Sequence, residues 1–181
     1  MLQNGGVKHG LIAGNGQFPF LVVDGAKRAA AKLSVIAIKE ETDPNIDHYA
    51  ENVLWVNIGQ LGKMISFFKS NGVEQVMMAG QVKHVQIFSG ALPAARMLKM
   101  LGNLPKRNTD ALIGGVADEM AKEGIELIDS THFIKDQLAE IGVLTKRKPT
   151  DIELENIEYG LKIANEIARL DLGQTIVVRA K

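Results

Sequence analysis

A glycine turn near the N-terminus carries the clearest chemical signal in this chain. Gly14-Asn15-Gly16 follows a short apolar run, residues 7–13, and precedes a segment with helical spacing, residues 17–32. Pro19 suits the first turn of such a helix, where a backbone N–H would lack a partner anyway. A strand, a glycine turn and a helix start together direct N–H groups and the positive end of a helix dipole to one point. The arrangement predicts an anion site whose usual occupant is phosphate.

Two other interpretations of this turn stay open. A dinucleotide-binding fingerprint has a small residue at the position that Pro19 occupies here, so the fingerprint is broken. Glu40 and Glu41 nevertheless lie near the spacing of a ribose-binding acid, which keeps NAD as an alternative ligand. The other alternative is a tight structural turn that binds nothing.

A pair of acids, Asp110 and Asp118, is a candidate metal site. Both lie in a predicted helix over residues 109–123, where carboxylates eight residues apart could point the same way. Mg²⁺ is commonly bound by one or two carboxylates together with substrate phosphates. The plainer alternative assigns Asp110 to the N-terminal charge of the helix and Asp118 to its solvated face.

Four methionines form a further candidate feature: Met77, Met78, Met97 and Met100. Methionine adapts to irregular apolar shapes, so these side chains could border a groove for an acyl chain. Ordinary core packing and a subunit interface are the alternatives.

Composition narrows the class of protein. The chain has 181 residues, 46% of them hydrophobic, which is enough for one well-buried domain, or for one domain and a fragment of a second. Its 21 basic and 21 acidic residues balance, so no overall field favours nucleic acid as a partner. The chain has no cysteine, its N-terminus lacks the features of a signal peptide, and no apolar stretch approaches a membrane span. We therefore expect a soluble, cytoplasmic protein.

The elements that must position these residues alternate between strand and helix. Apolar β-rich runs predict strands over residues 7–13, 33–38, 53–58 and 73–79, and helical spacing predicts helices over 17–32 and 60–71. This alternation indicates an α/β fold, a Rossmann-like parallel sheet with helices on both faces. The carboxyl ends of parallel strands share one edge, where ligands bind. Gly14, Gln60 and Gly80 should therefore lie along that edge.

The second half of the sequence is predicted to be more helical. We expect helices over residues 92–101, 109–123 and 133–141, with a strand over 125–129. Thr150 and Glu153 fit a capping box that opens a helix to about Leu170, and this helix should pack on the sheet. Residues 173–181 then read as a glycine followed by a strand. These features predict a Rossmann-like substrate-binding domain over residues 1–172 and the start of a second domain over 173–181.

Several motifs, in order along essentially the whole chain, resemble those of the LpxI family. They are Gly10-Leu11-Ile12-Ala13-Gly14-Asn15-Gly16-x-Phe18-Pro19, Gly59-Gln60-Leu61-Gly62, Met78-Ala79-Gly80-x-Val82-Lys83, Thr109-Asp110 and Gly173-Gln174-Thr175. The family comprises UDP-2,3-diacylglucosamine pyrophosphatases of lipid A biosynthesis. The resemblance implies Mg²⁺-dependent hydrolysis of the substrate to 2,3-diacylglucosamine 1-phosphate and UMP. It also implies peripheral contact with the membrane that holds the lipid and a homo-oligomeric assembly.

The resemblance suggests roles for particular residues. The turn Gly14-Asn15-Gly16 would engage phosphate or uridine groups, and Gln60, Gly80 and Lys83 would shape the rest of the pocket. Family members continue beyond the Gly-Gln-Thr strand into a domain that supplies a catalytic aspartate, so the resemblance implies that this residue lies outside the present chain. We therefore expect the chain by itself to bind substrate without turnover. A stand-alone nucleotide-sugar or phosphate-binding module is the alternative function.

Overall fold

The chain folds into two compact units. A computed structural model describes residues 7–82, 95–104, 109–170, 172–173 and 175–179. Contacts within the chain separate Met1–Leu138 from Ala139–Lys181. This division falls well before the boundary expected at residue 172, because the long helix near the C-terminus belongs to the second unit.

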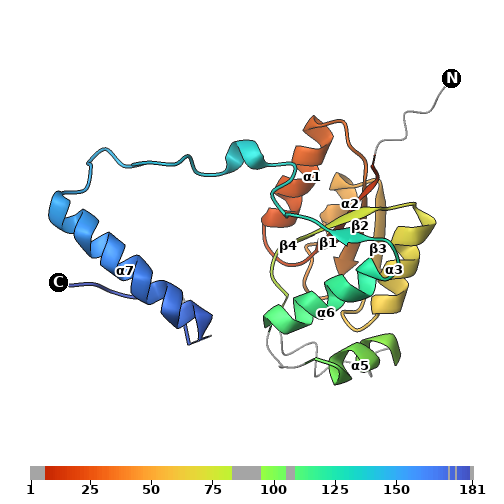
Figure 1. The fold of residues 1–181 in the computed structure, drawn as a ribbon. Coiled ribbons are helices and arrows are strands. Elements are labelled where there is room, and N and C mark those ends of the chain that lie inside the picture. The colour runs from red at the N-terminus through yellow and green to blue at the C-terminus, as the bar shows by residue number, and fades with distance from the viewer. Residues whose placement is uncertain (1–6, 83–94, 105–108, 171, 174, 180–181) are drawn as a thin grey trace. The chain divides into compact units, whose positions relative to one another are not determined.

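The first unit is built on a five-stranded parallel sheet (Figure 1). Its strands are β1 (His9–Ala13), β2 (Leu33–Ile38), β3 (Asn52–Val56), β4 (Gln75–Ala79) and β5 (Glu126–Leu127). Their order is β3-β2-β1-β4-β5, and every pair is parallel. The chain therefore fills one side of β1 first and then crosses to the other side. The register sets Ala13 beside both Ala37 and Ala79, so β1, β2 and β4 end together at what we call the carboxyl edge.

Helices cover both faces of this sheet. Leu11, Val35 and Met77 point to one face, where they form a core with α1 (Phe18–Arg28) and α2 (Ile46–Tyr49). Ile12, Ile36 and Val76 point to the opposite face, where they form a core with α3 (Leu61–Ser70), α5 (Ala95–Gly102) and α6 (Thr109–Ala121). Because successive strand residues point to opposite faces, continuous apolar runs produce a sheet that is buried on both sides. The predicted α/β fold is confirmed.

Several local predictions differ from the structure. Residues 133–141 do not form a helix beyond a single 3₁₀ turn, Lys135–Gln137. The segment between β2 and β3, for which no helix is predicted, contains the short helix α2, whose Ile46 is fully buried. The β5 strand is limited to Glu126–Leu127, although Ile128 continues the hydrogen bonding by donating its N–H to Val76 O at 2.8 Å.

The second unit contains α7 (Asp151–Arg169), which begins with the predicted capping box. Thr150 N donates to Glu153 Oε2 at 2.7 Å, and Glu153 N donates to Thr150 Oγ1 at 3.3 Å. The expected C-terminal strand is not formed, since residues 175–179 have no regular secondary structure. They lie instead against α7, where a Cβ atom on Gly160 would stand 3.1 Å from Val178 Cγ2. Within the described residues, no helix is long and apolar enough to cross a membrane.

Candidate functional site

The loops that follow β1 and β4 are joined by backbone hydrogen bonds at the carboxyl edge. Gly14 N donates to Ala79 O at 2.8 Å, Asn15 N to Gln81 O at 2.7 Å, and Gln81 N to Asn15 O at 3.1 Å. A Cβ atom on Gly14 would stand 2.6 Å from Gln81 O, and one on Gly80 would stand 2.6 Å from Asn15 O. Both glycines are therefore required by close backbone approach. We call Gly14, Asn15, Gly80 and Gln81 the turn clamp.

The turn clamp changes how the glycine turn can bind an anion. The N–H groups of Gly14 and Asn15 are occupied by Ala79 and Gln81, so the expectation that the whole turn offers free donors is wrong for these two residues. Donors for an anion must come from Gly16 and the first turn of α1, which has no side-chain cap. Gly16 has φ +95°, and nothing lies within 4 Å of the position that its Cβ would occupy. Its surroundings therefore leave room for a ligand against the backbone.

The other expected pocket residues have different positions. Gln60 precedes α3. Its side-chain oxygen Oε1 accepts from Asn57 N at 3.0 Å, so this side chain is hydrogen-bonded within its own loop. Gly80 belongs to the turn clamp and adopts φ +91°. Lys83 lies outside the residues that the structure describes.

An apolar cavity of about 380 Å³ opens beside the turn clamp. Gly14 and Gly80 border it at the carboxyl edge, and its walls come from β1, β2, α3, β4, α5 and α6. The side chains that line it are overwhelmingly apolar: Ile12, Ile38, Ile58, Leu61, Met64, Met78, Val82, Met97, Leu112, Ile113 and Val116. A cavity with one polar backbone border and apolar walls can accept a molecule that has a polar head and a hydrocarbon chain.

The four methionines that the sequence analysis singles out do not all line this cavity. Met78 and Met97 line the cavity. Met77 is fully buried on the opposite face of the sheet, within the core that contains α1. Met100 is 5% exposed in the core around α3 and does not line the cavity. Met97 is at the same time buried in the core around α3, so only Met77 and Met100 are core residues alone. That Met78 and Met97 border a groove for an acyl chain stays a prediction.

A network of charged side chains holds α5 and α6 around the cavity. Arg96 Nε lies 2.8 Å from Glu119 Oε2, and its Nη1 lies 2.9 Å from Glu123 Oε1. Lys69 and Lys122 each add an ion pair of 2.6 Å, to Glu123 and Glu119 respectively. Hydrogen bonds from Lys122 and Arg96 lower the pKa of Glu119, and those from Lys69 and Arg96 lower the pKa of Glu123. These acids are thus engaged in packing α5 against α6 and α3.

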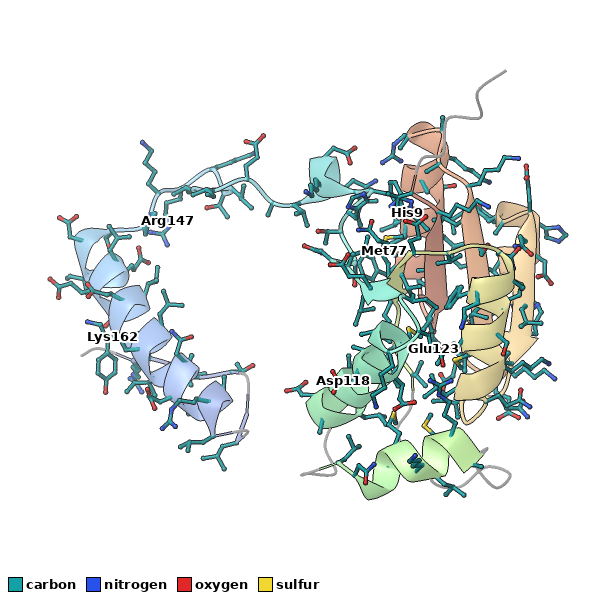
Figure 2. The ribbon with its side chains drawn as sticks, turned by 45° about the vertical axis from the view of Figure 1, so that its right-hand side comes forward. His9, Met77, Asp118, Glu123, Arg147 and Lys162 are labelled. Atoms are coloured by element: carbon teal, nitrogen blue, oxygen red, sulfur yellow. The ribbon has the colours of Figure 1, made fainter. Side chains whose placement is uncertain are left out.

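Asp110 and Asp118 do not fit a shared magnesium site. Both are exposed on α6, and Figure 2 shows Asp118 on that helix. At a rise of about 1.5 Å per residue, positions eight apart are separated by about 12 Å along the axis, whereas Mg²⁺ needs ligands at about 2.1 Å. Among the described residues, no group of three or more His, Asp or Glu side chains could hold a metal ion. We therefore assign no metal ligand in this part of the chain and derive no step through a metal.

The cavity walls contributed by α6 are the part of the site that sequence analysis missed. Leu112 and Val116 are four residues apart and therefore lie on one face of the helix. This spacing is a sequence signal for a buried stripe. It does not distinguish a stripe that packs into a core from one that borders a cavity, because both need the same apolar residues.

The fold and this cavity together define a class: an α/β domain with a parallel sheet and a cavity at the carboxyl edge of that sheet. Comparison of the sequence with known families makes the assignment specific. The model of the LpxI N-terminal domain matches residues 8–137, and that of the LpxI C-terminal domain matches residues 140–181. The chain belongs to the LpxI family, as the sequence motifs predict.

A curated relative supports this assignment. UDP-2,3-diacylglucosamine pyrophosphatase LpxI of Caulobacter vibrioides is 34% identical over 174 residues, which make up 94% of this chain. The same alignment covers 61% of the relative, so the chain spans less than two thirds of that protein's length. The two family models meet within two residues of the division between the compact units.

Solved structures with a similar fold are distant in sequence. WbmG of Bordetella bronchiseptica, in complex with NAD and UDP, is 14% identical with a TM-score of 0.43, over 70% of this chain and 38% of that one. MurG of Acinetobacter baumannii is 12% identical with a TM-score of 0.41, over 61% of this chain and 39% of its own. At these values the similarities say nothing about function.

Proposed function

We propose that the protein to which this chain belongs hydrolyses the pyrophosphate bond of UDP-2,3-diacylglucosamine, and that the first unit binds this substrate. The name of the Caulobacter relative supports the reaction. Its place in lipid A biosynthesis is what the family resemblance implies. The observation that carries the proposal for the first unit is the apolar cavity that borders the glycine turn. A nucleotide-sugar without acyl chains has no hydrocarbon chain to bury against these apolar side chains.

The proposal gives the two parts of the site different roles. The N–H groups of Gly16 and the start of α1 would face the diphosphate, where a helix N-terminus favours negative charge. The cavity would take an acyl chain against Met78, Met97 and Val116. Each buried methylene contributes about 0.8 kcal/mol, so four of them raise affinity by roughly a hundredfold or more.

The proposal also covers what the resemblance implies for the whole protein. It includes Mg²⁺ as the metal of the reaction, a cytoplasmic location, peripheral contact with the membrane and a homo-oligomeric state. None of these is assigned to particular residues of the described chain.

A cavity-filling substitution tests the proposed function. Val116→Phe would place an aromatic ring in the cavity, and Gly114→Phe is the matched control because nothing lies within 4 Å of a Cβ at that position of the same helix. Calorimetry with UDP and with a short-chain UDP-2,3-diacylglucosamine compares the variants. We expect Val116→Phe to weaken binding of the acylated ligand by roughly tenfold or more, the loss of about two methylenes, while UDP binding stays unchanged.

Two outcomes would contradict the proposal. If wild-type protein binds UDP and the acylated ligand equally well, the cavity does not take an acyl chain. The chain would then act as a nucleotide-sugar or phosphate-binding module. If Val116→Phe and Gly114→Phe weaken acyl binding equally, the effect does not come from the cavity.

A further inference from the structure

The peptide group between Ala13 and Gly14 is held from both sides. On one side Gly14 N donates to Ala79 O of β4 at 2.8 Å. On the other side Ala13 O accepts from the hydroxyl of Thr42 at 2.6 Å, in a buried hydrogen bond. This peptide is the last one before the glycine turn, so its orientation sets the direction in which the turn leaves the sheet.

Thr42 is itself fixed in one orientation. Its side-chain oxygen accepts from Ile38 N at 2.8 Å, and its own N–H donates to Ile38 O at 2.9 Å. A hydroxyl has a single hydrogen, and the bond from Ile38 directs that hydrogen toward Ala13. Thr42 is 5% exposed, which keeps water from replacing either bond.

The loop that carries Thr42 is strained in a way that brings the hydroxyl to this place. Glu40 adopts φ +68°, a conformation that residues other than glycine rarely take. Such strain persists where the surrounding structure compensates for it, often near a functional site. Here the turn at Glu40 returns the chain to the carboxyl end of β2 and places Thr42 against β1.

We propose that Thr42 is a positioning residue for the anion-binding glycine turn, an inference that rests on the proposed function. The Thr42 hydroxyl and the Ala79 carbonyl fix the Ala13–Gly14 peptide, and the turn clamp fixes the next one. The N–H group of Gly16 is thereby held in place before a ligand arrives. Preorganised donors bind an anion more tightly because less ordering accompanies binding.

Substitutions that keep the shape of the side chain test this role. Thr42→Val removes the hydroxyl, Thr42→Ser keeps it, and Thr42→Cys keeps a weak donor of similar size. Ser34→Ala is the control, since Ser34 is another buried polar residue, which accepts from Asn52 near the amino end of β2, away from the glycine turn. UDP binding and the amide hydrogen exchange of Asn15 are measured for every variant.

Thr42→Val removes both hydrogen bonds of the hydroxyl, and the lost bond to Ala13 O is the one that frees the turn. We expect it to weaken UDP binding by about tenfold, the cost of that one bond, and to speed exchange of the Asn15 amide by a similar factor. Thr42→Ser should retain wild-type affinity and exchange, and Thr42→Cys should fall between the two. Ser34→Ala should lower stability without changing either quantity at the turn. If Thr42→Val does not fold, the comparison of Thr42→Cys with Thr42→Ser decides.

Two results would overturn the inference. One is a folded Thr42→Val protein with wild-type UDP affinity and wild-type exchange at Asn15. The other is Thr42→Ser with the same loss as Thr42→Val, which would assign the effect to the methyl group. If wild-type protein itself does not bind UDP, the proposed function fails, and exchange at Asn15 then decides on Thr42 alone.

Discussion

The two edges of the sheet in the first unit both carry a cavity, yet they differ in what their polar groups do. At the amino edge, a cavity of about 330 Å³ is bordered by Lys8, Lys27 and Lys32. Lys8 Nζ donates to Asn71 O at 3.3 Å, Lys27 Nζ lies 5.3 Å from the ring centre of Tyr49, and Lys32 pairs with Glu51 at 3.5 Å. These cations are already engaged by the protein itself.

The carboxyl edge shows the opposite distribution. Its cavity is lined by apolar side chains, and the polar groups beside it are backbone atoms of a glycine turn. Part of that turn is committed to the turn clamp, but Gly16 has open space around its Cβ position. Under the proposed function the ligand site is the cavity with fewer charged residues, so the number of charged residues around a cavity is a poor guide to binding. Backbone N–H groups that face open space beside an apolar cavity are a better guide.

The largest expected effect comes from breaking the turn clamp. Gly14→Ala would set a Cβ atom 2.6 Å from Gln81 O, a backbone atom that cannot move aside easily. We expect a loss of about 2–3 kcal/mol in the free energy of unfolding, as for other overpacked sites, together with loss of UDP binding. Gly72→Ala at the amino edge is the control: its nearest neighbour is the flexible end of Lys8, so we expect only the strain of its φ of +68°, about 1–2 kcal/mol, and no change in UDP binding. Denaturant unfolding and calorimetry measure both; equal losses in the two variants would contradict the special role of the clamp.

A smaller effect is expected from alanine at Gly16. Comparison with alanine at Gly124 separates the loss of ligand contact from the cost of backbone strain. Gly16 and Gly124 both have positive φ, +95° and +78°, and both have nothing within 4 Å of a Cβ. Alanine at either position should therefore cost about 1–2 kcal/mol of stability through strain alone. We expect Gly16→Ala in addition to weaken UDP binding by about tenfold, since its methyl group would occupy the ligand's space.

Calorimetry on these two variants gives the comparison directly. Gly124→Ala should bind UDP as the wild type does, because Gly124 follows α6 and takes no part in the turn. Equal affinities in both variants would remove Gly16 from the anion site.

The amino edge should respond to pH. His9 begins β1, and its ring lies 5.3 Å from that of His132, centre to centre (Figure 2 shows His9). Burial lowers the pKa of His9, and the neighbouring His132 lowers it further. The folded protein therefore binds fewer protons than the unfolded chain, whose histidine pKa is about 6.5, so this contribution to stability is present above that pH and is lost as pH falls below it.

Replacing His9 tests this dependence. His9→Asn should make the fall in melting temperature between pH 7 and about pH 5.5 shallower than in the wild type. UDP affinity at each pH should be the same in both proteins, because His9 lies at the amino edge. A parallel pH dependence of stability in wild type and variant would show that His9 does not titrate as described.

The smallest effect is expected from the lysines of the amino edge. Lys27→Met removes a cation that lies over the Tyr49 ring, which is worth about 0.5–1 kcal/mol at an exposed site. UDP affinity should stay within about twofold of the wild-type value, since this charge is already partnered and lies away from the glycine turn. A tenfold loss of affinity in this variant would move the anion site to the amino edge.

The sheet could be predicted because each strand is a continuous apolar run bounded by glycine or polar residues. Such a run lacks the alternation of apolar and polar residues that a strand with one solvated face shows. It therefore indicates a strand that is buried on both faces, as in a parallel sheet with helices on both sides. The glycine turn could likewise be predicted from the sequence. The hydrogen bonds of that turn could not, because the partner loop at Gly80 and Gln81 is distant in sequence and the pairing depends on strand order.

The division of the chain could not be predicted for a related reason. The apolar stripe of α7, which includes Ile157 and Leu161, shows that the helix has a face to bury but not which segment covers it. In the structure these side chains share a groove with Ile176 and Val178 of the same unit. A β-branched run predicts a strand only where a partner strand is available, so residues 175–179 lie along the helix instead.

Photo-crosslinking tests the central claim, that one edge of the sheet binds both the phosphate and the acyl chain. A UDP-2,3-diacylglucosamine analogue with a diazirine on the acyl chain is irradiated with the protein, and the labelled residues are identified by mass spectrometry. The account predicts labelling at cavity-lining residues, namely Met78, Met97, Leu112, Ile113 and Val116, and its suppression by the unlabelled substrate. Labelling confined to the amino edge, around Lys27 and Tyr49, would contradict it.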